Sequence, residues 1–172
     1  MDAYDCISSK LDVREFSPKQ VPAKIKMKIL EAGRLTGSGL NIQHWRFVLV
    51  QDPESLKKLA QDGTSGKWVQ RCNLAVIVLT NPNYDFHMID AGRALQDMEL
   101  AAWNFGVASC LFTGIKLDSI RKDFNIPEHM QPDVVVGFGY PAKKIIGRKK
   151  RLLLHEVAFL EKYGNRMDPK KL

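Results

Sequence analysis

The segment from Phe86 to Phe105 restricts the possible folds most, because it has the pattern of one long helix without a single apolar stripe. Apolar side chains surround most of this helix, and a few polar residues interrupt them, at Asp90, Arg93, Gln96, Asp97 and Glu99. A helix that is apolar on most faces must be covered on most faces, inside a large core or between subunits. Because the chain has only 172 residues, the sequence favours a subunit interface.

Helical and extended patterns alternate along the rest of the chain. Pro22 and the apolar residues after it, at nearly helical spacing, predict a helix over 22–36. Apolar runs that end at turn residues predict strands over 47–51, 74–79, 107–112 and 134–138. Shorter helices are predicted over 2–9, 54–61 and 118–124, with a last segment over 152–163. No repeat or linker interrupts this order, which predicts one three-layer domain over residues 1–172, of the α+β or α/β class.

Basic residues give the chain a net charge of +7, and they cluster late in the sequence, at Lys143–Lys144, Arg148–Arg151 and Lys170–Lys171. Such a cluster is typical of a solvated face, a nucleic-acid footprint or a site for a single phosphate group. Aromatic residues that could stack on bases do not alternate with it, so we expect no nucleic-acid partner. A few converging Lys and Arg side chains are enough to bind one phosphomonoester.

Three cysteines, Cys6, Cys72 and Cys110, are scattered and odd in number, which is typical of a protein in the reducing cytoplasm. None of them has the spacing of a metal-binding motif, so we expect no metal. No apolar run approaches the roughly 20 residues that cross a bilayer, and the first residues do not resemble a secretory signal. We therefore expect a cytoplasmic protein without a membrane partner.

Small and amide-bearing residues connect the helix over 22–36 to the first strand. Gly37, Ser38 and Gly39 allow a close approach of the backbone to a ligand. Asn41 and Gln43 can hydrogen-bond the edge of a heteroaromatic ring. The same composition is also typical of an ordinary turn between a helix and a strand, so this segment alone leaves both interpretations open.

Five short motifs follow one another along nearly the whole chain. They are Lys10-Leu11-Asp12-Val13-Arg14-Glu15-Phe16, Ser38-Gly39-Leu40-Asn41-Ile42-Gln43-His44-Trp45, Asp90-Ala91-Gly92 with Gln96, Gly139-Tyr140-Pro141 and Lys149-Lys150-Arg151. In this order and at these intervals they resemble the motifs of the nitroreductase family of FMN-dependent oxidoreductases. The resemblance implies an α+β fold, a three-layer α/β/α sandwich with a central, mostly antiparallel sheet, in an intertwined homodimer.

The resemblance also implies a cofactor site for FMN. Basic residues near both ends of the chain would bind its phosphate and ribityl end, namely Lys10, Arg14, Lys149 and Arg151. The backbone of Leu11 would contact the isoalloxazine ring. Asp12 stands where the family usually has Ser, and its carboxylate is unfavourable beside a phosphate unless it orients Lys10 or Arg14.

Two further groups of residues are implied to reach the flavin ring. Ser38, Gly39 and Asn41 would approach it from the neighbouring subunit of the homodimer. Thr113 and Gly114 would present backbone N–H groups near flavin N5. A twofold dimer would build two equivalent sites of this kind.

No side chain is expected to be a catalytic acid or base, because the flavin carries the chemistry in this family. His44 replaces the usual proline of its motif, and a lone histidine of this kind is more typical of a structural role. Trp68 follows a Gly-rich loop, so it lies either at the mouth of the pocket or in a small core.

The implied activity is the transfer of hydride from NADH or NADPH to a small-molecule electron acceptor, such as a nitroaromatic or a quinone, in a ping-pong mechanism. One alternative is an FMN-binding carrier or sensor without general reductase activity. Another is a specialised reaction of the same family, such as dehalogenation or flavin fragmentation. A third is a basic module that binds RNA or DNA and has kept only the fold.

Overall fold

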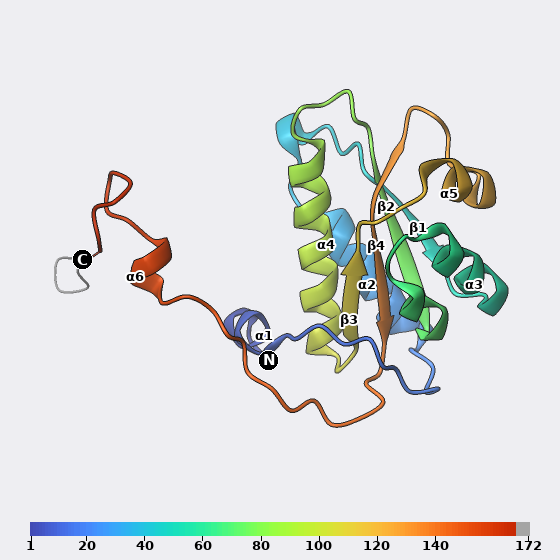
Figure 1. Cartoon of the computed structure of the whole chain (residues 1–172), viewed down its shortest axis with the longest axis horizontal. Helices are drawn as coiled ribbons and strands as arrows, with labels where there is room; N and C mark the ends of the chain where they lie inside the picture. The colour runs from blue at the N-terminus through green and yellow to red at the C-terminus, as the bar shows by residue number, and fades with distance from the viewer. Residues whose placement is uncertain (168–172) are drawn as a thin grey trace.

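The computed structural model describes residues 1–167 and has helices on both faces of one sheet (Figure 1). The charge cluster at Lys170–Lys171 lies outside the described residues. The strands are β1 (Arg46–Val50), β2 (Leu74–Thr80), β3 (Ala108–Phe112) and β4 (Gln131–Gly139). The helices are α1 (Ala3–Ser9), α2 (Ala23–Leu35), α3 (Pro53–Asp62), α4 (His87–Asn104), α5 (Leu117–Phe124) and α6 (Leu154–Val157), with the short 3-10 helices η1 (Gly39–Asn41) and η2 (Lys67–Arg71).

The sheet has the strand order β1-β2-β4-β3, and each pair of neighbouring strands is antiparallel. β2 and β4 lie at its centre, where Ile77 pairs with Val135. An isolated parallel bridge between Asp12 and Ser109 adds the N-terminal segment to the β3 edge. The mostly antiparallel central sheet and the α+β class are therefore confirmed.

Alternating side chains of the central strands build two separate cores. From β2, Leu74, Val76 and Val78 join the core that contains residues of α2 and α4. Ala75 and Ile77 point the other way and join the core that contains residues of α3, α5 and η2. Every residue of β2 is buried, because helices cover both faces of the sheet. The three-layer α/β/α arrangement is confirmed.

The predicted helix and strand boundaries agree with the structure to within one or two residues for most elements. The helix over 22–36 is α2, and the long helix over 86–105 is α4. Gly106, directly after the C-cap of α4, has a φ of 71°. This left-handed conformation favours glycine and ends the helix.

Within one chain, α4 is covered on one side only. Its buried residues are Asp90, Ala91, Ala94, Leu95, Met98, Glu99 and Ala102. On its other side, Met88 and Ile89 are 53% and 65% exposed. Among residues 1–167, no heavy atom outside the helix backbone and adjacent residues lies within 4 Å of a Cβ built at Gly92. The sequence requires α4 to be covered on most faces. The described part of a single chain therefore does not provide all of this cover.

After β4 the chain passes beneath α1 and then leaves the body as an arm that carries α6 (Figure 1). This arm, residues 152–167, contains the predicted last segment over 152–163, of which only Leu154–Val157 is α-helical. Its exposed apolar side chains are those of Leu152, Leu153, Leu154, Val157, Leu160 and Tyr163. Neighbouring exposed apolar side chains of this kind indicate a surface that interacts with another molecule.

No helix within residues 1–167 is long and apolar enough to cross a membrane. The same residues contain no group of His, Cys, Asp and Glu side chains that could hold a metal ion.

Candidate functional site

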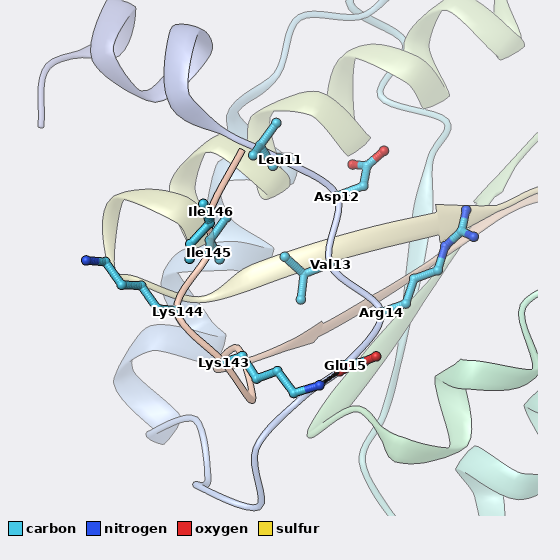
Figure 2. A pocket seen from close by; sticks show the side chains of 9 residues that line it. All are labelled: Leu11, Asp12, Val13, Arg14, Glu15, Lys143, Lys144, Ile145 and Ile146. Carbon is cyan, nitrogen blue, oxygen red and sulfur yellow. Dashed lines mark hydrogen bonds and ion pairs between the residues drawn. The ribbon is translucent and has the colours of Figure 1, made fainter. Parts of the chain in front are cut away.

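An extended N-terminal segment, residues 10–14, runs along the β3 edge of the sheet. Val13 donates its backbone N–H to the carbonyl of Ser109 at 2.9 Å, and Asp12 forms the bridge to the same residue. Side chains alternate along such a segment. Figure 2 shows that Asp12 and Arg14 point to one side of it and Val13 to the other.

Lys10 lies at the start of this segment and is held by two carboxylates. Its side chain is buried, and its Nζ lies 2.8 Å from Glu99 Oε1 and 2.5 Å from Asp12 Oδ1. Ser109 donates its hydroxyl to the same Glu99 oxygen at 2.7 Å. Burial lowers the pKa of Lys10, but the hydrogen bonds to Asp12 and Glu99 outweigh it and raise that pKa above its ordinary value. Lys10 is therefore charged and anchored by the protein itself.

Glu99 was not among the predicted site residues. It lies on the buried side of α4, between Met98 and Ala102, and is 3% exposed. A buried carboxylate without a cation is costly, so a glutamate at such a position signals a partner elsewhere in the chain. That signal is present in the sequence, but the partner, Lys10, lies 89 residues away.

Arg14 is exposed, and its guanidinium Nε donates to the Sγ of Cys110 on β3 at 3.3 Å. The segment that carries Arg14 forms one wall of a cavity of about 570 Å³. The other wall is the strap that follows β4, residues 143–146 (Figure 2). In this wall Lys143 forms an exposed ion pair with Glu15 at 3.1 Å.

Lys149 and Arg151 are the predicted basic residues near the C-terminus. Lys149 lies close to the N-terminal segment, whereas Arg151 contacts its neighbour in the sequence. The ammonium of Lys149 donates to the carbonyl of Ile7 in α1, the helix that leads into Lys10. Arg151 donates to the carbonyl of its neighbour Lys150 at 2.9 Å. Lys143 and Lys149 therefore lie near the N-terminal part of the chain.

Thr113 and Gly114 directly follow β3, the strand beside which the N-terminal segment runs. Gly114 accepts a hydrogen bond from the N–H of Thr64 at 2.8 Å. A Cβ at Gly114 would lie 2.3 Å from Thr64 Oγ1, so the close approach of the two loops requires glycine there. The side chain of Thr113 is exposed.

The predicted ring-contact residues lie in η1 and its flanks. Ser38 accepts the N–H of Gln43 with its hydroxyl oxygen at 2.9 Å. Gly39 donates its N–H to Asp90 Oδ2 near the start of α4, also at 2.9 Å. A Cβ at Gly39 would lie 2.5 Å from the ring of Phe86, so only glycine fits. Asn41 is exposed.

The two groups of predicted site residues lie at different ends of α4. Gly39 contacts Asp90 near the start of this helix, whereas Lys10 contacts Glu99 in its second half. At 1.5 Å per residue, these two contact points are about 14 Å apart along the helix axis. In the described part of one chain, residues 38–41 do not line the cavity beside the N-terminal segment.

Comparison with known proteins identifies the relatives of this chain. The model of the family described as "Nitroreductase family" matches residues 7–66 and 64–140, which is most of the chain. The chain belongs to the nitroreductase family. This is a family of oxidoreductases, and the resemblance seen in the sequence motifs is confirmed.

Relatives and solved structures of nitroreductase-family proteins support this assignment. A protein of Methanothermobacter thermautotrophicus, named as a candidate NADH dehydrogenase/NAD(P)H nitroreductase, is 30% identical over 83% of this chain and 79% of its own length. The crystal structure of a protein with the same candidate name from Bacteroides thetaiotaomicron has a TM-score of 0.84 at 26% identity, over 91% of this chain and 96% of that one. The fold of an FMN-dependent nitroreductase from Clostridium difficile has a TM-score of 0.86 at 20% identity, over 93% and 99% of the two chains.

Two further residues of this nitroreductase-family chain can now be placed. Trp68 belongs to the core: its ring packs edge-on against Phe112 and beside Phe16, with centroids 6.1 Å apart in each case. Of the two positions that the sequence left open for Trp68, the structure selects the small core. His44 is buried and bonded to Asp90, in agreement with a structural role.

Proposed function

We propose that this protein is an FMN-dependent oxidoreductase that uses NADH or NADPH to reduce small-molecule acceptors such as nitroaromatics and quinones. The observation that carries the proposal is the N-terminal segment, fixed on the β3 edge and facing a cavity with basic walls. The name of the Clostridium difficile protein of the same fold, an FMN-dependent nitroreductase, points to the same cofactor.

The residues present fit a flavin phosphate. A cavity of about 570 Å³ lies within the range that ligand pockets occupy, about 300–1,000 Å³. The two carboxylates of its wall are already paired, Asp12 with Lys10 and Glu15 with Lys143. Among residues 1–167, Arg14 and Lys144 of the same walls have no carboxylate partner within ion-pair distance. Figure 2 shows that the guanidinium of Arg14 points away from the strap, so it is available to a dianionic group on the Asp12 side of the segment.

The roles of the chain's own residues follow from this charge pattern. Bound FMN would supply two-electron chemistry between a nicotinamide and an acceptor. Arg14, Lys149 and Arg151 would bind the phosphate of FMN. Lys10 would act mainly by holding Asp12 and the N-terminal segment in place. Backbone groups of Leu11, Thr113 and Gly114 would line the ring. Because nicotinamide and acceptor would use one face in turn, we propose ping-pong kinetics.

We further propose that the working unit is an intertwined homodimer. Three features support it: the two separated groups of site residues, the exposed side of α4 and the apolar arm over residues 152–167. In a twofold dimer, Ser38, Gly39 and Asn41 of one chain would complete the site at the N-terminal segment of the other. Cys6, Cys72 and Cys110 are all unpaired thiols, which fits the cytoplasmic location that we propose.

Steady-state turnover of the FMN-loaded protein tests the proposed function. Consumption of NADH and of NADPH is measured with menadione and with a nitroaromatic compound, each at several concentrations. We expect turnover that requires FMN and gives parallel double-reciprocal lines, the signature of ping-pong kinetics. An FMN-loaded protein that oxidises neither nicotinamide with either acceptor would contradict the proposal and support the carrier or sensor.

A further inference from the structure

The loop over residues 38–44 has an unusual backbone. Leu40, Asn41 and Gln43 all have positive φ, of 50°, 56° and 56°. Each left-handed residue other than glycine costs on the order of 1 kcal/mol or more and persists only where surrounding contacts impose it. Three such residues in four positions therefore require an anchor nearby.

Asp90 supplies the first part of that anchor. Its side chain is buried at the start of α4, and its Oδ2 accepts two hydrogen bonds from the loop. One comes from the backbone N–H of Gly39 at 2.9 Å and the other from the ring Nε2 of His44 at 3.1 Å. One carboxylate oxygen therefore ties together both ends of the strained segment.

His44 supplies the second part, and its neighbours fix its tautomer. The backbone N–H of Asn81, which directly follows β2, points to the ring Nδ1 at 3.3 Å. Nδ1 must accept this hydrogen bond, so Nε2 carries the proton that is donated to Asp90. The ring also packs against Tyr84 and Phe86, with centroids 5.1 Å and 5.8 Å away. The histidine thus links the loop to both β2 and α4.

We propose that Asp90 and His44 are a positioning pair that holds Ser38, Gly39 and Asn41 in the conformation that meets the flavin ring. This inference rests on the proposed function, because it assigns the purpose of the pair to FMN binding. Neither residue touches the cofactor in this account. Both act through the loop, which they hold in its strained shape before the ligand arrives, so that binding does not have to order it.

The variants follow from the contacts. His44→Phe keeps an aromatic ring among Tyr84 and Phe86 but removes both hydrogen bonds. His44→Gln keeps a donor that can reach Asp90. His87→Phe is the matched control, because His87 is also a hydrogen-bonded histidine near the start of α4, bonded to Thr80 at 2.9 Å. Within residues 1–167, no side-chain hydrogen bond joins His87 to the loop.

Two measurements are made on each variant. The first is hydrogen exchange of the amides of residues 38–43 in the FMN-free protein, which reports the order of the loop. The second is the dissociation constant for FMN, from the quenching of flavin fluorescence. We expect His44→Phe to speed exchange in this loop and to raise the dissociation constant, each at least tenfold. His44→Gln should recover most of both changes, and His87→Phe should alter neither by more than about twofold.

Wild-type FMN affinity in His44→Phe, with faster exchange in the loop, would overturn the inference and leave the pair a purely structural role. A wild-type protein that does not bind FMN would instead overturn the proposed function, and the inference with it. If His44→Phe does not fold, Asp90→Leu replaces it, because the leucine side chain is of similar size and has no oxygen to accept the hydrogen bonds from Gly39 and His44. The same tenfold changes are expected for Asp90→Leu, and wild-type FMN affinity in this variant would overturn the inference equally.

Discussion

At the scale of single residues, buried charge holds the N-terminal segment on the β3 edge of the sheet, where we propose the site. Lys10 sits between Glu99, which is buried, and Asp12, whose side chain is 63% exposed. The sequence presented Asp12 as a departure from the family that is unfavourable unless it orients a basic neighbour. The structure shows that Asp12 forms an ion pair with Lys10. The second partner of Lys10, Glu99 on α4, could not have been deduced, because nothing local in the sequence pairs the two residues.

Removing the Lys10 ammonium should destabilise the fold strongly. In Lys10→Met, Glu99 keeps the Ser109 hydroxyl as its side-chain partner within residues 1–167, and a buried carboxylate left without its cation costs about 3–5 kcal/mol. Urea unfolding of the FMN-free protein measures this change. Lys143→Met is the matched control, because its ion pair with Glu15 is exposed and contributes about 0–1 kcal/mol. Equal losses in the two variants would contradict the account.

The same pair gives a pH dependence of stability with a definite sign. The pKa of Lys10 is raised in the folded protein, so its contribution is complete below the ordinary value of 10.5 and is lost as pH rises through the folded-state pKa. We therefore expect the stability difference between wild type and Lys10→Met to stay constant up to about pH 10 and to shrink above it. Unfolding free energies at pH steps on both sides of 10.5 measure this difference. A difference that grows with pH would contradict the assignment.

Arg14 should contribute to cofactor affinity and little to stability. It is exposed, and its side-chain contact within the described chain is the thiol of Cys110. A hydrogen bond to a charged group is worth about 1.5–3 kcal/mol, so Arg14→Gln should weaken FMN binding about 10- to 100-fold. Fluorescence titration measures this, with the exposed Lys58→Gln on α3 as a control of equal charge change. An unchanged dissociation constant in Arg14→Gln would remove Arg14 from the proposed site.

At the scale of elements, the apolar patterns were sufficient to place the helices and strands. The continuous run over 74–79 indicated a strand buried on both faces, and the structure places β2 at the centre of the sheet. The strand order β1-β2-β4-β3 was not predictable, because it depends on which distant runs pair. The position of Trp68 was also left open, since a Gly-rich loop can lead to a pocket or to a core.

The packing of η2 on β4 should tolerate no added volume at Gly137. A Cβ at this position would lie 2.7 Å from the ring of Trp68, which is wedged between Phe16 and Phe112. Gly137→Ala should therefore lower the unfolding free energy by about 1–3 kcal/mol. In the background of Trp68→Leu the same substitution should cost clearly less, which a double-mutant cycle by urea unfolding measures. Strictly additive effects would show that Trp68 is not the obstacle.

At the scale of the whole molecule, one chain is incomplete in two respects. It exposes apolar side chains on α4 and along the arm over residues 152–167, and it separates the two groups of predicted site residues. The sequence already indicated the first point, because the helix over 86–105 is apolar on too many faces for a chain of this length. The separation along α4 became visible only in the structure, since spacing in the motifs does not define distance in space.

Removing the arm should therefore affect assembly and cofactor binding together. We expect the full chain to sediment as a dimer that binds two FMN molecules. A chain that ends at Arg151 should dissociate at concentrations where the full chain is dimeric, and it should lose FMN at the same time. Sedimentation velocity, monitored at protein and flavin wavelengths, measures both properties in one experiment. A full-length monomer loaded with FMN would contradict the shared site.

The most direct measurement is the visible absorption spectrum of the protein after incubation with FMN and removal of excess flavin. Under anaerobic conditions, NADH or NADPH is then added, followed by menadione. We expect flavin bands that remain with the protein, bleach when the nicotinamide is added and return with the acceptor. A protein that retains no flavin, or retains flavin that neither nicotinamide bleaches, would contradict the assignment as an FMN-dependent oxidoreductase.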